Sequence, residues 1–213
     1  MSNCYYDATG TLKLKEITPV IKALFGVFCV EKYDDTTAYI KQESEGNSVN
    51  YDCMIGEISD EMEIDPSDTA DAMLIAMAEK LGKKDEVAAL LGEGQLDPNQ
   101  DADITFLFNL AQIMDDGHGL TEIEMEGAWH GSKMRLGNFG GSGEYVGKRF
   151  VLYTSSSQAA RTGQTISKLI AEANLAAVAE ELRKQFEQVL SGISDDKARA
   201  EVRTFIINEW QRK

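Results

Sequence analysis

The stretch TEIEMEGAWH, residues 121–130, alternates apolar and acidic side chains. In an extended chain Ile123, Met125 and Trp129 fall on one side, and the glutamates between them fall on the other. This period of two is typical of a β-strand with one face toward a core, and it predicts that Trp129 contributes to that core. The same reasoning predicts four more strands, at residues 11–15, 37–43, 49–58 and 145–154.

The three prolines each follow a residue that can cap a helix, in Thr18-Pro19, Asp65-Pro66 and Asp97-Pro98. Proline suits the first helical turn because its ring fixes φ and its missing N–H would have no partner there. Apolar periodicity then extends the expected helices to residues 19–28, 66–81 and 99–114, followed by Gly or a polar break. A short helix is expected at residues 85–91, and two amphipathic helices close the chain at residues 174–190 and 194–210.

This order of elements predicts an α+β protein in which an antiparallel sheet packs on helices and a helical pair ends the chain. A unit of helix, two-stranded hairpin and helix is expected twice, at residues 19–81 and 99–190, which favours two ferredoxin-like halves. The expected domains are therefore an N-terminal half, residues 1–95, and a C-terminal half, residues 96–213. Both could also form one compact unit around a shared core.

Negative charge is concentrated in one region of the chain. Residues 34–126 carry 24 Asp and Glu against four Lys, whereas the whole protein has a formal net charge of −15. A field of one sign speeds the approach of an oppositely charged partner and repels nucleic acid and anionic lipid. The charge map therefore predicts a basic protein partner and excludes direct binding to nucleic acid or to a membrane surface.

The composition is that of a folded cytoplasmic protein. At 213 residues and 43% hydrophobic content the chain can bury a sizeable core. Its three cysteines, an odd number without CxxC spacing, argue against a disulfide framework, and no apolar run is long enough to span a membrane. We therefore expect a cytoplasmic location.

Two acidic groups are candidate partner-binding sites. The first is the strand row Glu122, Glu124 and Glu126, with Asp115 and Asp116 upstream. Carboxylates about 6.8 Å apart along a strand could imitate the phosphates of a nucleic acid and bind Arg and Lys; the alternative is a solvated face that keeps the protein soluble. The second group comprises Glu57, Asp60, Glu61 and Glu63, and it continues through Asp65, Asp68 and Asp71 into the helix expected at residues 66–81. Its spacing does not fit a calcium-binding loop.

Two histidines flank the acidic strand. His118 and His130, with Asp115 and Asp116, could supply ligands for zinc or manganese, but Asp116-Gly117-His118-Gly119 is equally typical of a tight turn. The HExxH and zinc-deaminase motifs are absent, and the glycines at 137–147 fit neither a Walker loop nor a dinucleotide fingerprint. No catalytic residue, metal or cofactor is therefore expected.

Three segments carry a resemblance, namely DDGHG at residues 115–119, EGAWHGSK at 126–133 and GGSGEYVG at 140–147. They resemble uncharacterised small proteins of plasmids, phages and integrated elements. The resemblance implies a mobile element in a bacterial cell, a setting in which small acidic proteins disable host defences such as CRISPR or restriction complexes. It implies no catalytic residues.

The sequence thus favours a non-enzymatic acidic protein that binds and inhibits a basic, nucleic-acid-handling complex of bacterial defence, a CRISPR effector or a restriction enzyme. One alternative is a metal-dependent hydrolase that uses His118, His130 and neighbouring carboxylates. Another is a structural or regulatory module of a mobile element. The sequence leaves the oligomeric state open.

Overall fold

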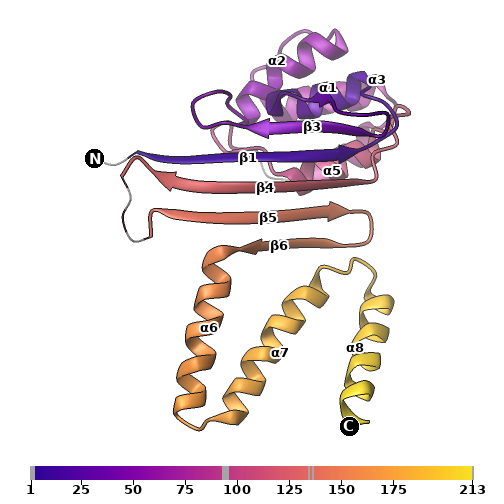
Figure 1. The fold of residues 1–213 in the computed structure, drawn as a ribbon. Coiled ribbons are helices and arrows are strands. Elements are labelled where there is room, and N and C mark those ends of the chain that lie inside the picture. Colours follow the sequence, from indigo (N-terminus) through magenta and orange to yellow (C-terminus); the bar gives the residue numbers. More distant parts are fainter. Residues whose placement is uncertain (1–2, 93–95, 134, 136, 213) are drawn as a thin grey trace.

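The strands of the protein form one antiparallel sheet in the order β2-β3-β1-β4-β5-β6 (Figure 1). The computed structural model describes residues 3–92, 96–133, 135 and 137–212. The strands in these residues are β1 Cys4–Lys13, β2 Glu31–Lys32, β3 Thr37–Gln42, β4 Glu122–Gly131, β5 Phe139–Gly147 and β6 Val151–Ser155. Together with the helices they confirm the predicted α+β class.

Helices α1 to α5 lie on one side of this sheet, while α6, α7 and α8 extend beyond its β6 edge (Figure 1). In the described residues the helices are α1 Pro19–Phe25, the 3-10 turn Gly26–Phe28, α2 Tyr51–Met62, α3 Ala70–Lys80, α4 Lys84–Leu91, α5 Ile104–Ile113, α6 Ser156–Ala171, α7 Leu175–Ser191 and α8 Asp196–Gln211. Within these residues no helix has the length and apolar character required to cross a membrane.

The core forms where the helices meet the inner face of the sheet. One row across the sheet pairs Ala38, Leu12, Ile123 and Val146, and all four are buried. Helices α1, α2 and α5 cover this row with apolar side chains that include Phe25, Met54, Ile58 and Leu107. Burying a side chain of this size contributes about 1.5–3 kcal/mol, so the row anchors the sheet.

The alternation predicted for residues 121–130 is confirmed. Ile123 and Met125 are buried in the core, and Glu124 and Glu126 are exposed on the opposite face of β4. Trp129 continues the core side of the strand, but it is only half-buried and lies outside the core cluster. The expectation of a fully core-facing tryptophan therefore needs correction, because the helices do not reach this end of β4.

One of the three expected proline starts is confirmed. Helix α1 begins at Pro19. The prediction is wrong for Pro66 and Pro98, because α3 begins after Thr69, whose side chain accepts a hydrogen bond from the Ala72 N–H, and α5 begins after the cap Asp103. A capping side chain accepts a hydrogen bond from an unpaired N–H of the first turn. A proline only removes one such N–H and adds no hydrogen bond, so it fixes the start of a helix less strongly.

Residues 49–58, predicted as a strand, belong mostly to helix α2. Asn50 caps this helix by accepting a hydrogen bond of 2.9 Å from the Cys53 N–H. Met54, Ile58 and Met62 are buried at a spacing of four, which satisfies both a strand period of two and a helix period of 3.6. The first expected hairpin is therefore absent from the described residues, and the predicted repeat of two ferredoxin-like halves is wrong.

Residues 145–154, predicted as one strand, span the end of β5 and most of β6. The chain reverses between them, where the Gly147 N–H donates a 2.9 Å hydrogen bond to the Phe150 carbonyl. Most of the glycine-rich stretch at residues 137–147 lies within β5, and the strand predicted at residues 11–15 extends back to Cys4.

The sheet combines strands from both predicted halves of the chain. β1 to β3 come from residues 1–95 and β4 to β6 from residues 96–213, and the core cluster likewise contains residues from both. The boundary predicted near residue 95 lies partly outside the described residues, which omit 93–95.

The C-terminal helices differ from the others in their burial. The expected pair is confirmed as α7 and α8, and α6 precedes it, capped by Ser155. Leu190 is the one buried residue in these three helices, all of whose residues are described. The amphipathic faces of α6 to α8 are thus largely left open to solvent.

The contact between Trp129 and Gly140 gives a test of the β4–β5 register. A Cβ at Gly140 would lie 1.9 Å from Trp129 Cζ2, so Gly140→Ala must displace the ring. We expect Trp129→Ala to cost about 1–3 kcal/mol, less than for a fully buried Trp. Gly140→Ala should cost less in the Trp129→Ala background than in the parent, measured by denaturant unfolding of all four proteins. Additive costs would contradict the contact.

Candidate functional site

The acidic row lies on the open face of the sheet, opposite the helices. Glu122, Glu124 and Glu126 share this face because alternate residues of β4 point the same way, about 6.8 Å apart. Across the sheet, Glu124 pairs with Thr11 of β1 and Tyr145 of β5. Two of the three predicted carboxylates, those at 124 and 126, are exposed.

A shallow hollow of about 500 Å³ runs over this part of the open face. Gly10 and Gly143, which have no side chains, leave its floor low, and tyrosine, leucine and threonine side chains line it together with glutamates of the acidic row. Its lining residues are Thr9, Gly10, Thr11, Tyr39, Glu124, Met125, Glu126, Gly143, Glu144, Tyr145, Leu152 and Thr154. The hollow thus combines carboxylates, hydroxyls and aromatic rings, which suits an extended, positively charged segment of a partner.

The neighbours of the row leave most of its charge uncompensated. Glu122 accepts a 2.9 Å hydrogen bond from the Tyr145 hydroxyl, and this bond raises the pKa of Tyr145. Lys13 pairs with Glu122 across the strands, but its Nζ donates to Thr37 Oγ1 at 2.8 Å. Among the described residues, none of the ion pairs includes a glutamate of the row.

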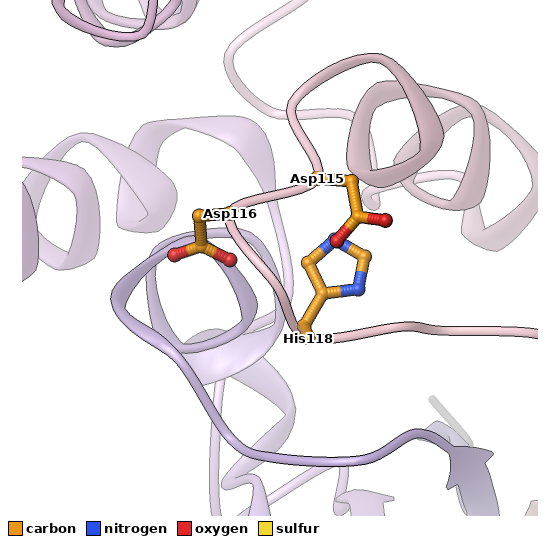
Figure 2. A group of neighbouring side chains, drawn as sticks. All are labelled: Asp115, Asp116 and His118. Carbon is orange, nitrogen blue, oxygen red and sulfur yellow. The ribbon is translucent and has the colours of Figure 1, made fainter.

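Asp115, Asp116 and His118 form a second cluster, in the loop between α5 and β4 (Figure 2). One ligand atom from each lies within 4.8 Å of the others, a spacing that a metal ion could bridge. The predicted association of the three residues is thus present. The two aspartates do not join the acidic row, however, because Asp116 faces the start of α1.

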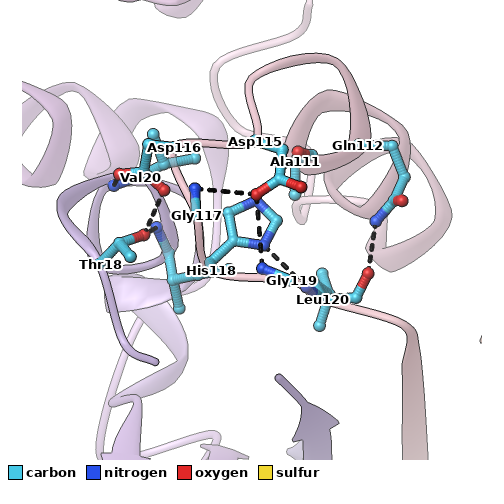
Figure 3. A network of polar contacts seen from close by, with 11 residues as sticks. Thr18, Val20, Ala111, Gln112, Asp115, Asp116, Gly117, His118, Gly119 and Leu120 are labelled. Atoms are coloured by element: carbon cyan, nitrogen blue, oxygen red, sulfur yellow. Dashed lines mark hydrogen bonds and ion pairs between the residues drawn. The ribbon is translucent and has the colours of Figure 1, made fainter. Parts of the chain in front are cut away.

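The hydrogen bonds of the two aspartates are structural (Figure 3). Asp116 accepts from the Thr18 hydroxyl at 2.6 Å and from the Val20 N–H at 3.3 Å, which ties the loop to the first turn of α1. Asp115 Oδ1 accepts from the N–H groups of Gly117 and Gly119 at 3.0 and 3.4 Å. Partial burial opposes ionisation of Asp115, but these two bonds outweigh it and lower its pKa.

His118 is fully buried, and both of its ring nitrogens are occupied. Nδ1 accepts a 2.8 Å hydrogen bond from the Leu120 N–H, so the ring proton belongs on Nε2, which donates to the Ala111 carbonyl at 3.0 Å (Figure 3). A metal needs an unprotonated ring nitrogen with a free lone pair. In this arrangement the ring offers none, so the cluster is better explained as a latch that holds α5, α1 and β4 together.

His130 lies at the other end of β4, so the structure does not bring the two histidines together. Its Nε2 is 3.0 Å from Asp7 Oδ2, and its ring lies 5.3 Å from that of Tyr5. Asp7 also accepts from the Ser44 N–H at 2.8 Å. The contact with His130 and then this bond lower the pKa of Asp7. A single metal bound by His118 and His130 together does not fit this geometry.

The second acidic group lies on α2 and its cap, in the helical layer on the other side of the sheet. Glu61 forms a 3.3 Å ion pair with Lys22 of α1, and Glu63 ends the helix with a positive φ of 49°. Burial raises the pKa of Glu57, and the charges of Glu61 and Asp60 raise it further. The structure therefore separates the two predicted acidic groups, and part of the second is engaged in packing and pairing.

Sequence analysis did not find the other residues of the hollow. Tyr39, Tyr145 and Leu152 come from three different strands, and only the register brings them into one row with Glu124. It also missed Glu144, which lies on the helix-covered face beside Met125. The alternation of residues in β5 gave only a weak signal for the face on which Glu144 lies, because glycines occupy many positions of this strand.

No family model, curated protein or solved structure matches this chain. Functional inference therefore depends on the site itself. The open face presents fixed negative charge, hydroxyl groups and a shallow hollow. Such a surface can bind cationic side chains. The carboxylates of the acidic row can also accept several hydrogen bonds from guanidinium groups.

His118→Ala tests the latch. The substitution leaves the buried Leu120 N–H and Ala111 carbonyl without their partner and opens a cavity, so we expect a loss of about 3–5 kcal/mol in the free energy of unfolding. The control His130→Ala removes an exposed ring and should cost about 1 kcal/mol or less. Thermal unfolding with added Zn²⁺ should give no stabilisation of the parent. A Zn²⁺-dependent rise that His118→Ala abolishes would restore the metal interpretation.

Glu144 gives a pH prediction. Burial, and then the charge of Asp103, raise its pKa, against the 3.3 Å bond from the Thr105 hydroxyl. A raised folded-state pKa means that the group favours folding fully below its unfolded pKa and loses this contribution as pH rises through the folded pKa. Glu144→Gln should therefore melt higher than the parent at neutral pH, with the difference shrinking toward pH 4.

The matched control for this prediction is Glu126→Gln, which removes one charge from the exposed face of the neighbouring strand. Its melting temperature should follow that of the parent across the same pH range. A Glu144→Gln difference that is constant with pH would show that the carboxyl is not held in an environment that favours its neutral form.

Proposed function

We propose that this protein is a non-enzymatic interaction protein that binds a basic surface of a nucleic-acid-handling protein through the open face of its sheet. The observation that carries the proposal is the row Glu122, Glu124 and Glu126 beside the hollow, without ion-pair partners among the described residues. On a solvated face these carboxylates would only add to solubility, and the strand spacing of about 6.8 Å would have no role. A row of carboxylates at strand pitch, by contrast, can occupy arginines and lysines that otherwise contact successive phosphates.

The rigid sheet supports this role. Glu124 and Glu126 lie on a strand paired on both sides, with β1 and with β5, so binding does not have to order a flexible segment. Preorganised charge loses less conformational entropy on association than charge on a mobile loop. The surrounding Tyr39, Tyr145 and Leu152 add area that can cover the aliphatic stems of arginine and lysine side chains.

The charge of the whole molecule favours a protein partner over nucleic acid. At a net charge of −15 the protein repels phosphate backbones and attracts basic clefts. The finer proposal is that the partner is a CRISPR effector or a restriction enzyme and that occupation of its nucleic-acid site inhibits it. This part rests on the resemblance of three sequence segments to proteins of mobile elements, and a location in the bacterial cytoplasm is part of the same proposal.

Removal of the row tests the proposal. Glu122→Gln with Glu124→Gln and Glu126→Gln keeps the shape of the face and removes three charges. Each lost charge-assisted contact costs about 1.5–3 kcal/mol, so binding should weaken at least about a hundredfold. In bacteria that carry one CRISPR or restriction system, the parent should restore plating of a targeted phage and the variant should not. Binding to the purified effector should also weaken as salt rises.

The matched control removes three exposed charges elsewhere, with Glu16→Gln, Asp52→Asn and Asp85→Asn. It should bind and inhibit like the parent. Full inhibition by the folded triple Gln variant would remove β4 from the site and direct attention to Glu57, Asp60, Glu61 and Glu63 on α2. A parent that restores plating against none of the systems would reject the defence partner.

A further inference from the structure

The C-terminal helices expose apolar side chains to an unusual degree. Leu175, Leu182 and Val189 of α7 are 68%, 53% and 47% exposed, and Phe205 and Trp210 of α8 are 70% and 67% exposed. Isolated exposed apolar residues are normal on a protein surface, but a concentration of them on adjacent helices marks an interaction site.

The pattern on α7 is regular. Its three exposed large apolar residues, Leu175, Leu182 and Val189, recur every seven positions, so they form one stripe along the helix. The exposed fractions show that α6 and α8 leave this stripe largely uncovered, although Phe186, on a neighbouring part of the same helix surface, has its ring 5.8 Å from that of Trp210 of α8. The period of seven is the spacing that packs one helix against another.

Helix α8 lacks cover on more than one side. Phe205 and Ile207 are both exposed, although two residues along a helix turn the side chains by about 200°. α8 is held to α7 by Arg203, which binds Glu187 at 2.6 and 3.0 Å. None of the residues of α8, all of which are described, is buried, so α7 covers only part of its surface.

The surface area of the whole chain agrees with a missing partner. The accessible surface is 13012 Å² for a mass of 23.5 kDa. A compact monomer of this mass exposes about 9,800 Å², so the chain has an excess of about 3,200 Å². Stable homodimers bury about 1,000–2,500 Å² per chain, an area that this excess can supply.

The charge of the module formed by α6, α7 and α8 decides which partner fits. Residues 156–213 carry nine Lys and Arg against eight Asp and Glu, whereas residues 1–155 carry 12 against 28. A basic partner would gain little from this nearly neutral surface. Two copies would not associate through their acidic sheets, because the like charges of the two sheets repel each other. Helices with both signs interspersed suit a copy of themselves, and they project away from the acidic sheet (Figure 1).

We propose that α6, α7 and α8 form the interface of a homodimer, in which the exposed faces of α7 and α8 pack against the same helices of a second copy. This arrangement keeps the two acidic sheets at opposite ends of the particle and leaves both open faces accessible. It is independent of the function proposed for those faces.

Sedimentation of the full chain tests the proposal. The parent should sediment at twice its 23.5 kDa mass. The variant Leu182→Glu with Phe205→Glu should raise the dimer dissociation constant at least about a hundredfold. The control Tyr33→Glu with Phe139→Glu changes two side chains that are equally exposed, at 75% and 68%, but lie outside the module, and it should remain dimeric. Increasing salt should not weaken the parent dimer, because apolar contacts are not screened.

A second measurement covers the case in which the Glu variant does not fold. In Trp129→Phe the remaining tryptophan is Trp210, and its emission should shift to shorter wavelength as the concentration rises through the dissociation constant. A monomer at every concentration with unchanged Trp210 emission would overturn the proposal. A dimer that persists in the folded Glu variant, or that the control disrupts, would overturn the assignment of the interface.

Discussion

The pairing of β1 with β4 is the constraint on which the rest of the structure depends. Ten residues of the N-terminal strand pair with ten residues more than a hundred positions later, from Cys4 with Gly131 to Lys13 with Glu122. Gly10 permits the close approach, since a Cβ there would lie 2.4 Å from the Glu124 carbonyl oxygen. A slip by one residue would turn Ile123 to solvent and the glutamates into the core, at a large desolvation cost.

This register also explains why the acidic residues of the chain serve different purposes. Asp103 and Asp116 accept hydrogen bonds from backbone N–H groups at helix starts, and the burial of His118 beside the latter fixes the entry into β4. Carboxylates of this kind stabilise local structure and have little capacity left for a partner. Glu124 and Glu126 have no such bond among the described residues, and their charge remains available on a rigid strand.

The molecule thus has two surfaces of opposite character at different places. The open face of the sheet is acidic and polar, whereas the module of α6 to α8 is nearly neutral and apolar. Because salt screens the first kind of contact and not the second, the two surfaces can act independently. If both proposals hold, each particle presents two acidic faces, and a partner with two basic sites would bind it with increased avidity.

The sequence by itself determined the α+β class, the amphipathic closing helices and the orientation of Glu122, Glu124 and Glu126, because these depend on the local period of side chains along one element. It did not determine that residues 51–62 form a helix, since a spacing of four fits both periods there. The hollow, the latch at His118 and the separation of His118 from His130 were decided by tertiary structure alone. They require the register between strands distant in the chain, which side-chain periodicity does not encode.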